Sequence, residues 1–124
     1  MARVEVVRKS RLRPGNSTPG MRRERAFESA GIIVARSRIS GGRSSAWHHH
    51  GKREVYGFLV EGTLRIEYLQ RGKKFVEVRA GDFFHIPRAL IHRDVNPRSR
   101  KTAVVANVFV GNGDVVVNVE GSRH

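Results

Sequence analysis

Hydrophobic residues along the chain gather in short runs and do not follow a sustained helical repeat. Runs rich in β-branched and aromatic residues cover residues 31–39, 55–60, 63–68, 74–79, 82–86, 91–95, 103–110 and 115–119. Residues typical of turns, mainly glycine, proline, asparagine and aspartate, stand between most of these runs. Strand-length runs that recur about every eight to twelve residues predict an antiparallel β-sandwich or barrel.

The first 30 residues are the most basic part of the chain and contain fewer hydrophobic runs. We predict two parts: a basic arm or strand over residues 1–30, which packs on the barrel or on a partner subunit, and a barrel domain over residues 31–124. Residues 4–7 suit a short strand, and residues 13–20 read as a loop because proline and glycine each occur twice in them. Residues 22–29 are the one segment that suits a short helix.

A chain of 124 residues has the size of one ordinary domain. It contains no cysteine, which excludes disulfides and thiolate metal sites, so a metal would bind through nitrogen and oxygen. No apolar run approaches the ~20 residues of a membrane-spanning helix, and the N-terminus has no apolar signal-peptide core. We therefore expect a cytoplasmic protein that does not enter the membrane.

The net charge of +13 is large for this length. Such a charge is typical either of a protein that binds an anionic partner, such as a nucleic acid or a small anion, or of a sequence with a general bias toward arginine. The basic residues are scattered along most of the chain, and few aromatic residues alternate with them to stack on bases. We therefore do not expect nucleic acid as a partner.

Candidate chemistry is densest in residues 47–54, which hold the single tryptophan, three consecutive histidines and a glutamate. In an extended segment, side chains two positions apart share a face, so His48 and His50 point one way and His49 the other. Imidazole nitrogen and carboxylate oxygen are usual ligands of divalent transition metals. Glu54 follows within a few residues, so the segment predicts part of a metal site that needs a further ligand downstream.

Two segments share a fixed spacing of special residues. The first has Gly42, five residues, His48, one residue, His50, three residues and Glu54; the second has Gly81, five residues, Pro87, then His92, three residues and Asn96. Together they resemble the two signature motifs of the cupin superfamily, and the resemblance covers about residues 31–119.

Two positions depart from that pattern. Ala89 stands where the second motif usually has glycine, so we expect its backbone to avoid a conformation reserved for glycine. Gly62 comes one residue later than usual after the first motif, so we expect an extra residue or a bulge in that strand.

The resemblance implies an all-β double-stranded β-helix, a small jelly-roll barrel. It also implies that His48, His50, Glu54 and His92 bind one divalent metal ion. Three nitrogens and one oxygen suit Fe(II), Mn(II), Ni(II), Co(II) or Zn(II), and the spacing does not select among them.

Other residues of the two motifs could complete the site. If Glu54 faces inward on a regular strand, Tyr56 and Phe58 face inward too and line the cavity. His85 is either a hydrogen-bonded core residue or an acid or base in the pocket. Trp47 either caps the pocket or packs at the start of a strand.

The leading functional hypothesis is a metal-dependent enzyme, a dioxygenase or an isomerase, acting on a small oxygenated or anionic molecule. Glu54 would act as its catalytic proton acceptor as well as a metal ligand. The alternative is a ligand-binding or sensing module without turnover. By the same resemblance we expect a homodimer, in which an N-terminal strand adds to the sheet edge of the partner.

Overall fold

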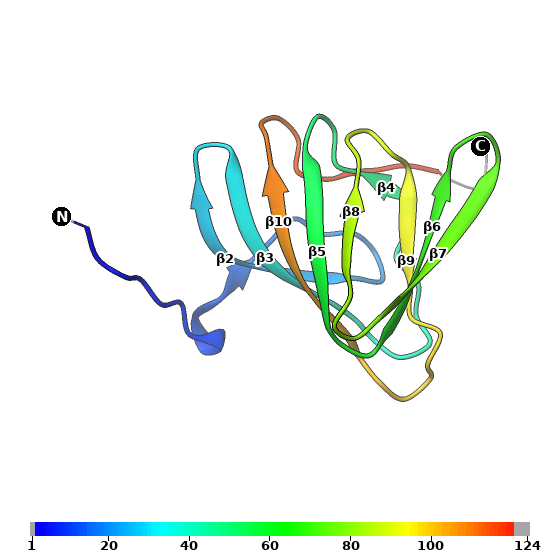
Figure 1. Ribbon diagram of the computed structural model, residues 1–124, viewed down its shortest axis with the longest axis horizontal. Coiled ribbons are helices and arrows are strands. Elements are labelled where there is room, and N and C mark those ends of the chain that lie inside the picture. Colours follow the sequence, from blue (N-terminus) through cyan, green and yellow to red (C-terminus); the bar gives the residue numbers. More distant parts are fainter. Residues whose placement is uncertain (1, 121–124) are drawn as a thin grey trace.

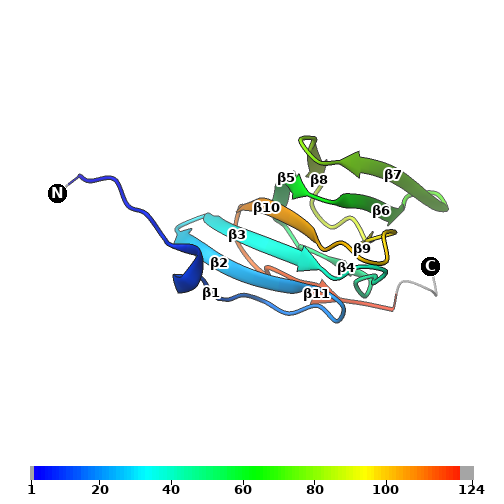
Figure 2. The same cartoon turned by 90° about the horizontal axis from the view of Figure 1, so that it is seen from below.

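The computed structural model describes residues 2–120, which fold into two antiparallel β-sheets packed face to face (Figures 1 and 2). The architecture is the predicted double-stranded β-helix. The larger sheet has the order β1-β2-β3-β10-β5-β8 and the smaller one β11-β4-β9-β6-β7. The strands are β1 (Arg13–Pro14), β2 (Arg22–Ser29), β3 (Ile32–Ile39), β4 (His48–His49), β5 (Glu54–Glu61), β6 (Thr63–Leu69), β7 (Lys73–Arg79), β8 (Phe83–Ile86), β9 (His92–Val95), β10 (Ala103–Val110) and β11 (Val117–Asn118).

The hydrophobic core lies between the two sheets and follows the alternation of the strands. In β3, Ile33 and Ile39 face inward while Ile32 faces solvent, and in β10 Val105 and Phe109 face inward. Period-two alternation with one buried face is what a two-layer β-fold requires. The strands from β3 onward, except β4, therefore form within or close to the predicted hydrophobic runs.

The segment predicted as a possible helix is a strand instead. β2 pairs with β3 along its whole length, from Arg22 opposite Arg38 to Ser29 opposite Ile32. An unpaired edge of β3 offers a full ladder of backbone hydrogen bonds, and this tertiary pairing outweighs a local helix preference. The only helix between residues 2 and 120 is a 3₁₀ turn at Lys9–Arg11 (η1), and no helix in that range is long and apolar enough to cross a bilayer.

Residues 4–7 form no strand in this single chain. The segment before η1 extends away from the two sheets (Figure 1), and Val4 and Val6 are 92% and 64% exposed.

Both departures from the motif pattern have a structural counterpart. The expected extra residue is present: Val104 pairs with Glu61 and Val105 with Leu59, which leaves Val60 as a bulge in β5. The expectation for Ala89 is wrong, because its φ of 61° lies in the left-handed region. The turn between Pro87 and Leu90 imposes this conformation, since the Ala89 amide must point at the carbonyl oxygen of Gly51, 2.8 Å away.

Candidate metal centre

Three histidines from two neighbouring strands meet inside the barrel. β4 and β9 pair so that His48 stands opposite His92, and His50 follows β4 on the same face as His48. The exposed fractions of His48, His50 and His92 are 1%, 3% and 0%, and one ring nitrogen of each lies within 4.8 Å of the others. The spacing of these side chains suits ligands of a single ion.

Backbone carbonyl groups orient each of the three imidazole rings. The Nδ1–H groups donate to the carbonyl oxygens of Ala46 (2.8 Å), Val115 (2.8 Å) and Leu90 (2.9 Å), respectively. A carbonyl can only accept, so the proton lies on Nδ1 and the lone pair on Nε2. Such a bond on the outer nitrogen is the usual support of a metal-ligating histidine.

The inner nitrogen of His92 has the strongest need for a partner. Its Nε2 atom is buried and has no hydrogen-bond partner among residues 2–120. A buried acceptor without a partner is unfavourable by about 1–3 kcal/mol. A metal ion held by the three Nε2 atoms would give His92 Nε2 the partner that it lacks. The three histidines therefore fit the divalent metal ion that the two motifs imply.

Burial keeps the three rings neutral. Desolvation lowers the pKa of His50 to about 3, and it drives the pKa values of His48 and His92 well below the ordinary range. A second contribution to the low pKa values of His48 and His50 is repulsion from His92. Neutral imidazoles at physiological pH can bind a cation without first releasing a proton.

Two charged residues that the sequence did not single out complete the site. Arg23 reaches in from β2, with its Nη2 atom 3.2 Å from His48 Nε2 and its Nη1 atom 2.5 Å from Thr18 Oγ1. Asp94 is buried on β9, and its Oδ2 atom lies 3.6 Å from His48 Nε2. Burial lowers the pKa of Arg23 to about 10, although the negative charge of Asp94 acts to raise it. Burial also raises the pKa of the Asp94 carboxyl.

The position of Asp94 two residues after His92 was a usable signal, because alternate residues of a strand share a face. Arg23 gave no such signal. Its place in the interior depends on the pairing of β2 with β3, which the sequence did not predict.

The prediction that Glu54 lies with the three histidines is wrong. The inward positions of β5 are Val55, Gly57 and Leu59, so Glu54 faces outward. Its Oε1 atom accepts from His85 Nε2 at 2.5 Å, and its Oε2 atom accepts from the backbone amide of Arg88 at 3.1 Å. These bonds lower the pKa of the Glu54 carboxyl, the one from His85 most. Val55 occupies the inward position, which removes Glu54 as ligand and as catalytic group.

Because Val55 faces inward, the alternation of β5 places the predicted pocket residues on the outer face of the larger sheet. Tyr56 is 50% exposed and stacks on His85 at 4.8 Å, and Phe58 packs against Phe83 at 4.7 Å. The prediction that Tyr56, Phe58 and His85 line the cavity is therefore wrong. His85 instead pairs with Glu54 at the surface.

Trp47 and His49 also lie outside the histidine cavity. The Trp47 ring packs under the guanidinium group of Arg93 at 5.0 Å, so it packs at the start of β4 and does not cap the site. His49, predicted to face away from its neighbours, accepts a hydrogen bond from the Gly51 amide.

The cavity in front of the histidines has a volume of about 10 Å³. That is room for about one water molecule. Asp94 is the only carboxylate among its lining residues, and the rings of Phe84 and Phe109 form part of its wall. Anything larger than an ion with a water-sized ligand requires one of these side chains to move.

Comparison with known proteins agrees with this architecture. The model of a family described as "Cupin domain" matches residues 35–110, more than half of the chain. A germin-like protein, subfamily 2 member 3 of Arabidopsis thaliana, is 28% identical over 82 residues, which are 64% of this chain and 37% of the relative.

Solved structures that are similar to this chain include an oxalate oxidase and an oxalate decarboxylase. An oxalate oxidase in complex with the substrate analogue glycolate superposes with a TM-score of 0.71 and 25% identity, over 86% of this chain and 60% of that one. The oxalate decarboxylase of Lactobacillus farciminis, in a formate complex, superposes with a TM-score of 0.73 and 19% identity. The match covers 89% of this chain and 34% of that one. The chain thus spans less than two thirds of these relatives. From its matching family model, its two motifs and its fold, the chain belongs to the cupin family.

Proposed function

We propose that this protein is a metal-dependent cupin enzyme, of dioxygenase or isomerase type, acting on a small oxygenated or anionic molecule. The observation that carries the proposal is the convergence of three buried imidazole rings, those of His48, His50 and His92, on one cavity. Fe(II), Mn(II), Co(II), Ni(II) and Zn(II) all suit three imidazoles. When bound, such an ion supplies Lewis-acid or dioxygen chemistry at its open positions.

The groups beside the histidines favour a small anionic substrate. Arg23 brings a buried guanidinium to the cavity, and guanidinium groups bind carboxylates in a planar, two-pronged geometry. The small volume argues for a compact molecule. Glycolate and formate, which occur with the structural relatives, are compact anions, and either one would need a wall side chain such as Phe84 to move before it could enter. We therefore place small carboxylates first among candidate substrates.

Asp94 replaces Glu54 as the acidic group of the proposed site. It is the only carboxylate that lines the cavity, and Arg23 balances its charge. In this position it can accept a hydrogen bond from a ligand and orient it in front of the histidines.

Metal analysis followed by turnover assays tests the proposed function. Protein purified without added metal is analysed for bound ions, titrated with each of the five metals, and assayed for oxygen uptake and product formation. The assays use small carboxylates, flavonols, diketones and sugar phosphates. His49→Ala serves as the matched control for His50→Ala, since only His50 faces the cavity. Absence of bound metal in every preparation, with stability unchanged by chelator, would exclude the proposal.

The tightness of the cavity favours one alternative, a ligand-binding module without turnover. Such a module would retain one small anion per chain at its metal and release no product. If the protein turns over any substrate and His92→Ala abolishes that turnover, the protein is an enzyme and not a binding module.

We further propose that the protein forms a homodimer. The outer face of the larger sheet exposes apolar side chains that a partner would cover, among them Phe83 (80%), Val60 (52%), Tyr56 (50%) and Ile32 (42%). The extended arm before η1 adds Val4 and Val6. Its backbone has no strand partner among residues 2–120 and is available to the sheet edge of a second copy.

A further inference from the structure

Basic residues from separate parts of the sequence meet on one surface of the barrel. Residues 13–23, 37–53 and 95–104 contain arginine and lysine but no aspartate or glutamate. In the fold, the turn before β2, the loop after β3 and the loop before β10 come from these three segments. An acid-free surface therefore arises from parts of the chain that are far apart in sequence.

Backbone hydrogen bonds hold the three segments together. Ala46 donates to the carbonyl oxygen of Pro19 at 2.8 Å, and Gly42 donates to that of Arg98 at 2.9 Å. Next to it, a Cβ atom at Gly41 would lie only 2.6 Å from the carbonyl oxygen of Ser99, so the two loops touch through their main chains. The arrangement is part of the folded framework and does not depend on surface side chains.

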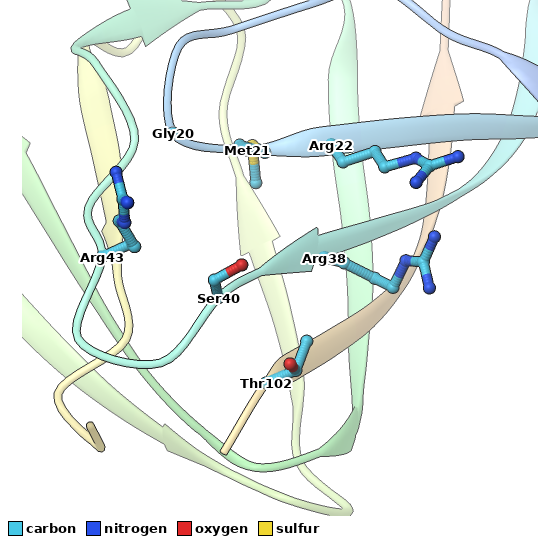
Figure 3. Close-up of a pocket in the computed structure, with 7 residues that line it drawn as sticks. All are labelled: Gly20, Met21, Arg22, Arg38, Ser40, Arg43 and Thr102. Carbon is cyan, nitrogen blue, oxygen red and sulfur yellow. The ribbon is translucent and has the colours of Figure 1, made fainter. Parts of the chain in front are cut away.

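These segments enclose a surface pocket of about 460 Å³ (Figure 3). Three arginines, a serine and a threonine line it, and no aspartate or glutamate of residues 2–120 does; the polar lining residues are Arg22, Arg38, Arg43, Ser40 and Thr102. In Figure 3 the side chains of Arg22 and Arg38 extend side by side, and Arg43 stands on the other side of Ser40.

The two parallel arginines form an unfavourable pair in the absence of an anion. Arg22 and Arg38 are direct cross-strand partners on β2 and β3, and like charges in that relation destabilise a sheet. The nearest acid, Glu24, lies 3.7 Å from Arg22 and 3.1 Å from Arg38, but it also pairs with Arg36 at 2.9 Å. One carboxylate thus serves three guanidinium groups, and positive charge remains in excess.

The other side of the pocket has polar groups without a partner in the fold. The side chains of Ser40, Arg43 and Thr102 make no hydrogen bond or ion pair with any residue between 2 and 120. Their donors are available to a ligand.

We propose that this pocket binds a small phosphate-bearing anion. The neighbouring guanidinium groups of Arg22 and Arg38, with Arg43 on the other side of the pocket, match the charge and the several oxygens of a phosphate or diphosphate better than the single charge of a monocarboxylate. No aromatic side chain lines the pocket, so it offers no surface on which bases could stack, as a single-stranded nucleic acid would need. The site is separate from the three histidines, since only Met21 lines both cavities.

Titration of the full chain with inorganic pyrophosphate, in chelator and at low salt, tests the proposal by calorimetry. We expect one binding event per chain. Arg38→Ala and Arg43→Ala should each weaken it about tenfold, the usual loss for one charge-assisted contact. Arg79→Ala on β7 removes the same charge away from the pocket and should change the affinity by less than about twofold. His92→Ala should leave it unchanged.

Other outcomes would overturn the proposal. These are no pyrophosphate binding, an equal loss with Arg79→Ala, or a loss with His92→Ala, which would place the anion at the metal centre. A single-stranded oligonucleotide that binds far more tightly, with an affinity falling over orders of magnitude between ~50 and ~200 mM salt, would indicate a nucleic-acid surface instead. If Arg38→Ala unfolds, as circular dichroism would reveal, the exposed variants Arg43→Gln and Ser40→Ala decide the matter.

Discussion

His48 and His92 stand directly opposite each other on the paired strands β4 and β9, and their rings are 4.3 Å apart. Each ring donates its Nδ1–H to a carbonyl two residues earlier in the chain, Ala46 for His48 and Leu90 for His92. The sheet pairing brings the two rings together, and the two carbonyls aim both Nε2 atoms inward. The geometry of the proposed metal site is thus a property of the backbone.

Replacement of His92 by alanine should abolish high-affinity metal binding. Two of three imidazoles would remain, and Glu54, which faces outward, cannot take the place of the third. We expect the affinity for Mn(II) or Co(II), measured by calorimetry, to fall by about a hundredfold or more, as the loss of a whole ligand exceeds the 10–100-fold loss typical of a supporting contact. His49→Ala should bind as the unchanged protein does; an equal loss there would contradict the assigned ligands.

Replacement of Val55 by glutamate should add an anionic ligand at the inward position of β5. Val55 is 1% exposed and lines the cavity with the three histidines. Without metal the variant should unfold at a lower temperature, because a buried carboxylate is unfavourable. With metal we expect an affinity at least about tenfold higher. Glu54→Gln is the control and should leave metal affinity unchanged; a large loss with it would restore Glu54 to the site.

These two residues illustrate what sequence reasoning could reach. The positions of the β3, β5, β6, β7 and β10 strands followed from hydrophobic runs and turn residues, and His48, His50 and His92 followed from alternation and motif spacing. The error at Glu54 came from the motif resemblance, which implied a glutamate ligand separated from His50 by three residues. The motif spacing does not determine which residues of β5 face inward after the turn. In β5 the buried residues Val55 and Leu59 face inward, so Glu54 faces outward.

Long-range contacts account for the other errors. Arg23 enters the cavity only because β2 pairs with β3, and no local pattern announces that pairing. The gathering of Arg22, Arg38 and Arg43 likewise depends on the fold, which is why the charge looked diffuse along the chain.

Acidification should destabilise the metal-free protein. The folded-state pKa of His50 is about 3 and those of His48 and His92 are also lowered, whereas an unfolded histidine titrates near 6.5. Below about pH 6.5 the unfolded chain binds protons that the folded chain does not, so stability is lost as the pH falls. At pH 5 the loss for His50 should be about 2 kcal/mol relative to pH 7.5, measured by urea unfolding. His50→Gln should reduce the loss by this amount; an unchanged loss would contradict it.

Substitution of Phe83 should weaken the proposed dimer. Its ring is 80% exposed on the outer face of the larger sheet, beside Phe58. Phe83→Ser removes apolar area that a partner would bury, so we expect monomers in sedimentation equilibrium at micromolar concentration. Deletion of residues 1–8, which retains the buried Thr18, tests the arm separately and should also yield monomers. A dimer that survives the deletion unchanged would exclude addition of the arm to the partner's sheet edge.

Glycine at position 89 should stabilise the protein. Ala89 has a φ of 61°, and the left-handed conformation is unfavourable for a residue with a Cβ atom by about 1–2 kcal/mol. Glycine removes that strain but loses more chain entropy on folding, by about 0.4–1 kcal/mol, so we expect a net gain of up to about 1.5 kcal/mol in urea unfolding. Ala80→Gly, in a turn with no positive φ, should instead destabilise by the entropy alone. If both variants lose stability equally, the turn before His92 is not strained.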